Sequence, residues 1–102
     1  MAINVAINGF GRVGRAYLKA VREEKGIKVV VINDLGDLEN LAYLLKYDSA
    51  YGVADFPIET DKQNSLLIID GEKIKFIQEK EPQNLPWEDL NIDVVVECTE
   101  FF

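Results

Sequence analysis

The sequence predicts an α/β fold, a mainly parallel Rossmann-type sheet with an antiparallel hairpin inserted before the last strand. Two observations near the start predict it. A short apolar strand, Ile3 to Ile7, leads through a turn at Gly9 into an amphipathic helix. A second strand, Lys28 to Ile32, is β-branched and almost continuously apolar, as is typical of a strand covered on both faces. Strands alternating with a helix in this way indicate a parallel sheet.

The turn between the first strand and the helix carries three glycines at G-x-G-x-x-G spacing, Gly9, Gly11 and Gly14. In such a turn the first glycine permits the tight bend and the second lets the backbone approach a pyrophosphate. The third lets the helix pack closely on the sheet. The start of the helix offers unpaired N–H groups and a positive dipole end to the anion. We therefore expect a dinucleotide site here, with Arg12 and Arg15 adding positive charge and Arg15 the more solvated of the two.

The helix is expected to run from about Gly11 to Glu24, with Gly26 just past its end. Its apolar residues fall close to one face, which we expect to pack on the sheet: Val13, Tyr17, Leu18 and Val21.

Asp34 follows the second strand, about 20 residues after the glycine turn. A carboxylate at this position accepts hydrogen bonds from the adenosine ribose hydroxyls and repels a phosphate on the 2′ oxygen, which favours NAD over NADP. The alternative is a turn or helix-start carboxylate, because Asn-Asp pairs are common in turns.

A second helix is expected from a cap at Asp37 to about Tyr47, and its apolar residues form a core stripe: Leu38, Leu41, Ala42 and Leu45. An extended stretch follows at Asp55 to Glu59. The Asp70-Gly71 pair between two apolar runs, Ser65 to Ile69 and Lys73 to Gln78, predicts a hairpin.

The remaining chain, Glu79 to Glu88, reads as a charged, proline-containing connector before a last strand, Asp93 to Glu97. We expect Trp87 within the connector to pack at the edge of the core; a stacking role is the alternative, which no other residue supports.

Composition limits the possible functions. The 102 residues suffice for one domain, and the net charge of −7 argues against nucleic-acid or anionic-membrane partners. A single cysteine, the lack of a leader and the lack of a long apolar run predict a cytoplasmic protein. We identify no catalytic or metal-ligating set: there is no histidine, and Cys98 follows a buried-type strand, so we expect a small core thiol.

Five segments stand out along the chain: Ile7 to Arg15, Ile32 to Leu35, Leu44 to Ser49, Asn84 to Trp87 and Val96 to Thr99. In order and in register, over essentially the whole chain, they resemble the glyceraldehyde-3-phosphate dehydrogenase family. A related branch, erythrose-4-phosphate dehydrogenase, shares several of them, but Asn33-Asp34-Leu35 fits the first branch better.

The resemblance implies an enzyme in which a cysteine attacks an aldehyde, a histidine acts as base, NAD takes the hydride and inorganic phosphate releases the acyl group. By position it places four residues along the cofactor, Asp34 on its adenosine ribose and Thr99 under it. The four are Asn8, Phe10, Arg12 and Val13. Lys80 stands where the family usually has an arginine beside the adenine, so this contact should be weaker or different.

The chain also departs from the family. Glu100 stands in place of a glycine and could crowd the cofactor, whereas Tyr51 and Gly36 replace a histidine and a threonine with modest expected effects. The family continues into a catalytic domain that this sequence lacks. We therefore expect residues 1–102 to form an incomplete NAD-binding domain that binds NAD without turnover, and that dimerises unless its missing half is present. Two alternatives stay open: a binding or assembly module that has lost NAD affinity, and the NAD domain of an erythrose-4-phosphate dehydrogenase.

Overall fold

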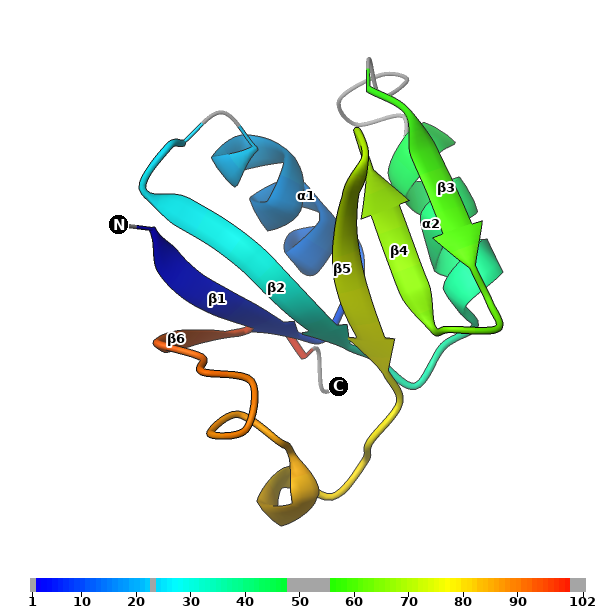
Figure 1. Cartoon of the computed structure of the whole chain (residues 1–102). Helices are drawn as coiled ribbons and strands as arrows, with labels where there is room; N and C mark the ends of the chain where they lie inside the picture. The colour runs from blue at the N-terminus through cyan, green and yellow to red at the C-terminus, as the bar shows by residue number, and fades with distance from the viewer. Residues whose placement is uncertain (1, 23, 48–55, 100–102) are drawn as a thin grey trace.

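The computed structural model describes residues 2–22, 24–47 and 56–99. They form a six-stranded sheet in the order β3-β4-β5-β2-β1-β6 (Figure 1). Along the chain, α1 connects β1 to β2, and α2 lies between β2 and β3. The strands and helices are β1 (Ile3–Asn8), α1 (Arg12–Val21), β2 (Ile27–Asn33), α2 (Leu38–Tyr47), β3 (Ile58–Asp61), β4 (Leu66–Ile69), β5 (Glu72–Ile77), the 3₁₀ turn η2 (Pro82–Asn84) and β6 (Val94–Glu97).

The sheet has a parallel half and an antiparallel half. β1 pairs in parallel with β2 and β6, and β2 pairs in parallel with β5. β3 and β4, and β4 and β5, pair antiparallel. The α/β, mainly parallel prediction with an inserted hairpin is therefore confirmed. The extended stretch expected from residue 55 becomes the edge strand β3, which begins at Ile58 and continues to Asp61.

The hairpin between β4 and β5 turns at the expected pair. Asp70 and Gly71 both have positive φ, 51° and 84°. Two successive positive values are what a type I′ turn requires, and the twist of this turn matches that of the flanking strands.

The pairing of β2 is uneven along its length. Val5 pairs with Val29 but the next residue, Ala6, pairs with Val31, so the ladder contains an irregularity at this point. In the described structure β2 pairs with β5 only over its last three residues, Val31–Asn33. The two strands are therefore joined at their carboxyl ends and diverge towards their amino ends (Figure 1).

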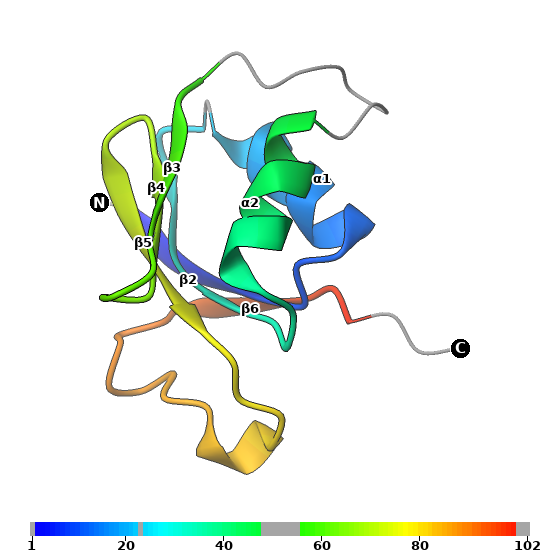
Figure 2. The ribbon, with the colours of Figure 1, turned by 90° about the vertical axis from the view of Figure 1, so that its right-hand side faces the viewer.

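Both α-helices cover the same face of the sheet (Figure 2). Asp37 caps α2 as expected, since its Oδ2 accepts the backbone N–H of Asn40 at 3.0 Å. The predicted stripe of α2 is buried against the sheet. The core lies between the helices and the strands, and its most enclosed side chains include Ile7, Phe10 and Leu45.

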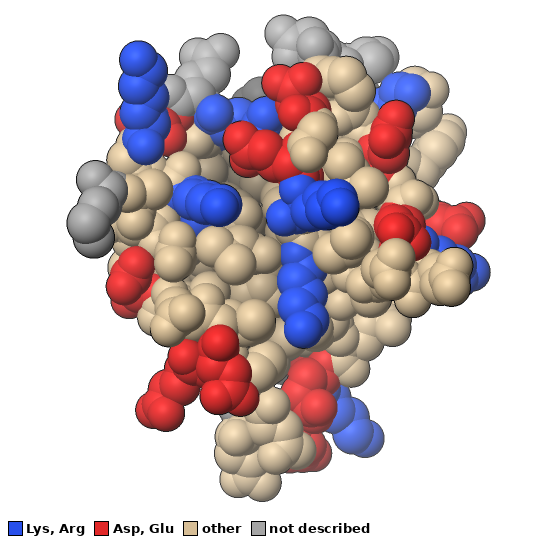
Figure 3. Space-filling view, in the orientation of Figure 1, with Lys and Arg blue, Asp and Glu red and all other residues tan. Residues whose placement is uncertain are grey.

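The opposite face of the sheet has no α-helix on it within the described residues. Figure 3 shows basic side chains over the middle of this face with acidic ones around it. The strand pairing places the exposed lysines Lys28, Lys73 and Lys75 there. The second strand is nevertheless enclosed on both faces at its carboxyl end, since the consecutive residues Val31 and Ile32 are both 0% exposed, whereas Lys28 near its start is exposed. The last strand is less enclosed than expected, with Val94 47% exposed at the sheet edge.

Helix α1 is shorter than predicted and faces the sheet differently. It ends at Val21, where the chain turns so that the Gly26 carbonyl accepts the N–H of Ile3 at 2.8 Å. Leu18 is buried, and Tyr17 and Val21 pack against the core, but Val13 is 55% exposed. Placing Val13 on the buried face was wrong because the close approach of Gly14 to the sheet turns the preceding residue outward. None of the described helices is long and apolar enough to cross a membrane.

Candidate functional site

The glycine turn joins β1 to α1 at the carboxyl edge of the sheet. Gly9 has φ +97°, and a Cβ there would lie 2.7 Å from the carbonyl carbon of Cys98. A Cβ on Gly14 would lie 2.3 Å from the Gly9 carbonyl oxygen. Both positions therefore require glycine, Gly9 for the bend and Gly14 for the packing of the helix against the turn.

The first turn of α1 is left open for an anion. Gly11 is the N-cap residue, with no side-chain hydrogen bond at the cap and no acidic residue in the first turn. The backbone N–H groups of Arg12 and Val13 have no intrahelical acceptor at this position, as at any helix start. The positive end of the helix dipole adds to their attraction for a negative group.

Arg15 is buried beneath the glycine turn and hydrogen-bonds its backbone. Its side chain is buried, and Nη1 donates a hydrogen bond of 3.0 Å to the Phe10 carbonyl. The expectation that Arg15 is solvated was wrong, because the helix brings it back beneath the turn that precedes it. Arg12 is exposed and contributes charge at the surface.

Asp34 reaches from the end of β2 to the glycine turn. Its Oδ2 accepts the N–H of Phe10 at 2.6 Å, and its Oδ1 accepts the N–H of Gly36 at 2.7 Å. A carboxylate offers about four acceptor positions, so each oxygen retains capacity for another donor. The structure thus shows Asp34 in the turn role, because it organises the turn after β2, and leaves acceptor positions on both of its oxygens.

A cavity of about 760 Å³ opens at this edge of the sheet. Its wall includes six of the ten residues predicted to bind the cofactor: Asn8, Gly9, Gly11, Asp34, Lys80 and Thr99. The other four lie around the turn without lining the cavity. Phe10 is fully buried and Gly14 lies under Gly9, whereas Arg12 and Val13 are exposed on α1.

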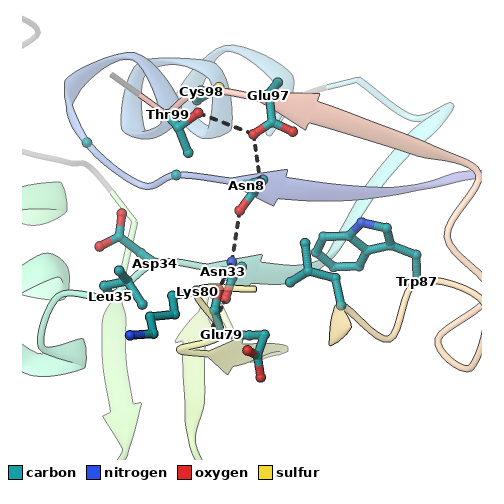
Figure 4. Close-up of a pocket in the computed structure, with 13 residues that line it drawn as sticks. Asn8, Asn33, Asp34, Leu35, Glu79, Lys80, Trp87, Glu97, Cys98 and Thr99 are labelled. Atoms are coloured by element: carbon teal, nitrogen blue, oxygen red, sulfur yellow. Dashed lines mark hydrogen bonds between the residues drawn. The ribbon is translucent and has the colours of Figure 1, made fainter. Parts of the chain in front are cut away.

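Two polar residues of the cavity wall, Asn33 and Glu97, which flank Asn8, were not predicted from the sequence. Asn33 is 5% exposed and donates from Nδ2 to the Asn8 Oδ1 at 2.8 Å. Asn8 in turn donates from Nδ2 to the Glu97 Oε1 at 2.6 Å, as the dashed lines in Figure 4 show. The available signal was positional: polar residues that end neighbouring parallel strands meet at one edge, where ligands of open α/β sheets bind.

Apolar side chains complete the cavity wall. Leu35, Leu85 and the half-buried Trp87 line it, with Leu35 63% exposed. Figure 4 places Trp87 on one side and Asp34 and Lys80 on the other. The expectation that Trp87 plugs the core edge was wrong, since the connector carries it into the cavity wall.

Cys98 is a buried thiol at the back of the site. It is 6% exposed and belongs to the core, and its N–H donates to the Asn8 carbonyl at 2.7 Å. Burial, and then the negative charge of Glu97, raise the pKa of this thiol above its usual value. The prediction of a small core thiol is confirmed.

The family departures can be placed only in part. Tyr51 and Glu100 lie outside the described residues. At Gly36 a Cβ would lie 3.0 Å from Asp34 Oδ1 and 3.3 Å from Leu41. A larger residue there would press on the carboxylate that holds the glycine turn.

Domains that place a glycine turn, an open helix start and a carboxylate together at the carboxyl edge of a parallel sheet bind dinucleotides, and this chain has that arrangement. Residues 3–102 match the family described as "Glyceraldehyde 3-phosphate dehydrogenase, NAD binding domain". The chain belongs to this family, and its cofactor is NAD.

Individual relatives agree with the family match. The chain is 49% identical to a glyceraldehyde-3-phosphate dehydrogenase of Borreliella burgdorferi, over 98% of this chain and 29% of that protein. It is 48% identical to one of Clostridium acetobutylicum, over 96% of this chain and 29% of the relative. A cytosolic one of Trypanosoma brucei brucei is 45% identical over the whole chain and 30% of its own length. The chain therefore spans about three-tenths of the length of these curated relatives.

Proposed function

We propose that this chain is the cofactor-binding part of a phosphorylating glyceraldehyde-3-phosphate dehydrogenase. In this role it holds NAD while residues outside this sequence transfer the hydride from an aldehyde phosphate, so the chain alone binds NAD without turnover. The observation that carries the proposal is the contact between Asp34 and the glycine turn at the mouth of the cavity.

Each predicted residue has a role in this proposal. Gly11 and the N–H groups at the start of α1 hold the pyrophosphate, with Arg12 and Val13 alongside. Asp34 binds the adenosine ribose. Asn8, Lys80 and Thr99 contact the cofactor from the cavity wall. Phe10 contributes its backbone, because its side chain is in the core, and Gly9 and Gly14 shape the turn.

Cys98 is not the nucleophile in this proposal. A catalytic cysteine needs a thiolate with a base in hydrogen-bond reach. The Cys98 thiol is buried with a raised pKa, and the sequence contains no histidine to serve as its base. A cytoplasmic setting is part of the proposal, and it is supported by the single cysteine of the sequence, which can form no disulfide within the chain.

Calorimetric titration of NAD and NADP into the chain tests the function. We expect NAD to bind and NADP to bind at least about tenfold more weakly, since one lost hydrogen bond to a charged group is worth that much. Asp34→Ala should reduce the ratio of the two affinities. The ratio isolates the ribose contact, because both ligands need the same glycine turn. Lack of NAD binding at millimolar concentration, or an unchanged ratio in Asp34→Ala, would contradict the proposal.

The proposal also includes a partner for the open sheet face, either the catalytic part of the enzyme or a second copy. It is supported by the position of both described α-helices on the other face and by the half-buried Leu66 and Ile68. Light scattering tests self-association of the isolated chain. A monomer at high micromolar concentration would contradict the second copy.

A further inference from the structure

A row of side chains crosses the carboxyl edge of the sheet from β6 to the segment after β5. Asn8 pairs in register with Glu97 on one side and with Asn33 on the other. Residues in register on parallel strands project to the same face, so these three side chains form one rung. Asn33 extends the row to Glu79, donating from Nδ2 to its carbonyl at 2.9 Å.

The two ends of the row fix the direction of every hydrogen bond in it. The Glu79 N–H donates to the Asn33 Oδ1 at 2.8 Å, so the Asn33 Nδ2 must face Asn8. Asn8 therefore presents Oδ1 to Asn33 and Nδ2 to Glu97. An ionised carboxylate only accepts, so Glu97 stabilises the same orientation from the other end.

The row connects the two walls of the cavity. At one end the Glu97 Oε1 also accepts the Thr99 hydroxyl at 3.3 Å. At the other end the Asn33 side chain hydrogen-bonds both the backbone N–H and the carbonyl of Glu79, the residue before Lys80. Asn33 also accepts the Gly9 N–H through its backbone carbonyl at 2.7 Å, so it touches the glycine turn as well.

We propose that Asn33 is a positioning residue for the cofactor site, and that Asn8, besides its own contact with the cofactor, transmits the hydrogen-bond direction between Asn33 and Glu97. Asn33 on β2 and Glu97 on β6 are separated by β1, which carries Asn8. The hydrogen bonds of Asn33 and Glu97 are energetically coupled through the Asn8 amide. Asn8 can accept from a donor at position 33 through its Oδ1 only if position 97 accepts from its Nδ2. The NAD readout below rests on the proposed function, whereas the unfolding readout does not.

A pair of compensating substitutions tests the coupling. Asn33→Asp removes the donor to Asn8 and to the Glu79 carbonyl, and should weaken NAD binding by roughly tenfold. Asn8 then has to turn its amide, which places Oδ1 against the Glu97 carboxylate. Glu97→Gln supplies a donor there and can still accept from Thr99. The double variant should therefore bind NAD at least about threefold more tightly than Asn33→Asp alone.

A matched control separates this rescue from a simple effect of charge. Glu79→Gln removes the same charge from a neighbouring residue whose side chain is outside the row. Combined with Asn33→Asp, it should give no rescue. Equal rescue by Glu79→Gln and Glu97→Gln would overturn the proposal, and so would rescue that persists when Asn8 is replaced by alanine.

The same variants, unfolded with urea in the absence of NAD, give a second measurement of the coupling. If the coupling between positions 33 and 97 in the free energy of unfolding disappears in Asn8→Ala, the transmission by Asn8 is supported. This holds even if the wild-type protein fails to bind NAD, because that failure would contradict only the proposed function. Additive effects on unfolding overturn the transmission by Asn8, whatever the NAD affinity. If the row only stabilises the fold, the variants that remain folded will bind NAD with unchanged affinity. That result would overturn the positioning role.

Discussion

Phe10 and Asp34 are joined by a hydrogen bond of 2.6 Å from the Phe10 N–H to the Asp34 Oδ2, although 24 residues separate them in sequence. The bond ties the end of β2 to the turn after β1. Because Asp34 also binds the Gly36 N–H, one carboxylate fixes two loops that border the cavity. Its contribution to the cofactor site therefore includes the shape of the turn as well as its charge.

Replacement of this carboxylate by an amide of the same size is expected to destabilise the protein without any cofactor. Asp34→Asn retains one acceptor, so one of the two N–H groups faces an NH₂ donor. We expect the free energy of unfolding to fall by about 1–3 kcal/mol, measured by urea unfolding. Glu88→Gln, at an exposed carboxylate, is the control. Equal stability of the two variants would contradict this role of Asp34.

Gly9→Ala is expected to be strongly destabilising. The added Cβ meets the Cys98 backbone at 2.7 Å, and the positive φ is unfavourable for alanine. Overpacking and backbone strain together should cost at least about 2 kcal/mol. Gly26→Ala is the matched control, because nothing lies within 4 Å of its added Cβ. Thermal unfolding should separate the two variants, and similar midpoints would show that the turn adapts.

Asp37→Ala should remove the cap of α2. Its Oδ2 satisfies the Asn40 N–H at the helix start, and loss of such a cap costs about 1 kcal/mol. Glu39 on the same helix makes an exposed ion pair with Lys62 at 3.8 Å. Glu39→Ala should therefore change the free energy of unfolding by less than about 1 kcal/mol. Urea unfolding should show a larger loss of stability for Asp37→Ala than for Glu39→Ala, and the reverse order would contradict the capping role of Asp37.

Binding of NAD should change the fluorescence of Trp87, the single tryptophan of the chain, which lines the cavity. Occupation of the cavity removes water from the half-buried indole, so we expect a shift or quenching of its emission. A titration should give the same Kd as calorimetry. Emission that stays constant while heat is released would place the cofactor away from this wall.

Cys98 should react slowly with iodoacetamide in the folded protein, even near pH 9. The thiolate is the reactive form, and burial raises the pKa of this thiol above its usual value. The folded state therefore prefers the protonated thiol. This contribution to stability is complete below the pKa of the unfolded thiol and is lost as the pH rises through the higher pKa of the folded one. The same protein in urea is the control, and equal rates in both states would contradict the burial.

Local chemistry made much of the fold predictable. The spacing of Gly9, Gly11 and Gly14 predicted the turn, Asp37 predicted the start of α2, and Asp70-Gly71 predicted a hairpin whose residues have the required positive φ. Each of these signals acts over a few residues, so the sequence alone is sufficient to recognise it.

The rest depends on contacts between distant segments. Asn33 and Glu79 are 46 residues apart, and their pairing follows from how β5 leaves the sheet. Trp87 enters the cavity wall because of the path of the connector, which has no periodic pattern to read. The burial of Arg15 follows from the close approach of α1 to Gly9 rather than from helical periodicity.

The short pairing of β2 with β5 has a consequence for the dynamics of the sheet. The ladder between these strands covers Val31–Asn33 at the carboxyl end, and the strands part towards Ile27 and Glu72. Amide hydrogens that point between these two strands should therefore exchange slowly beside the glycine turn and faster at the opposite end, whereas those that point to β1 and β4 stay paired. The sheet is therefore expected to be stiff where it borders the cavity and compliant where the strands separate.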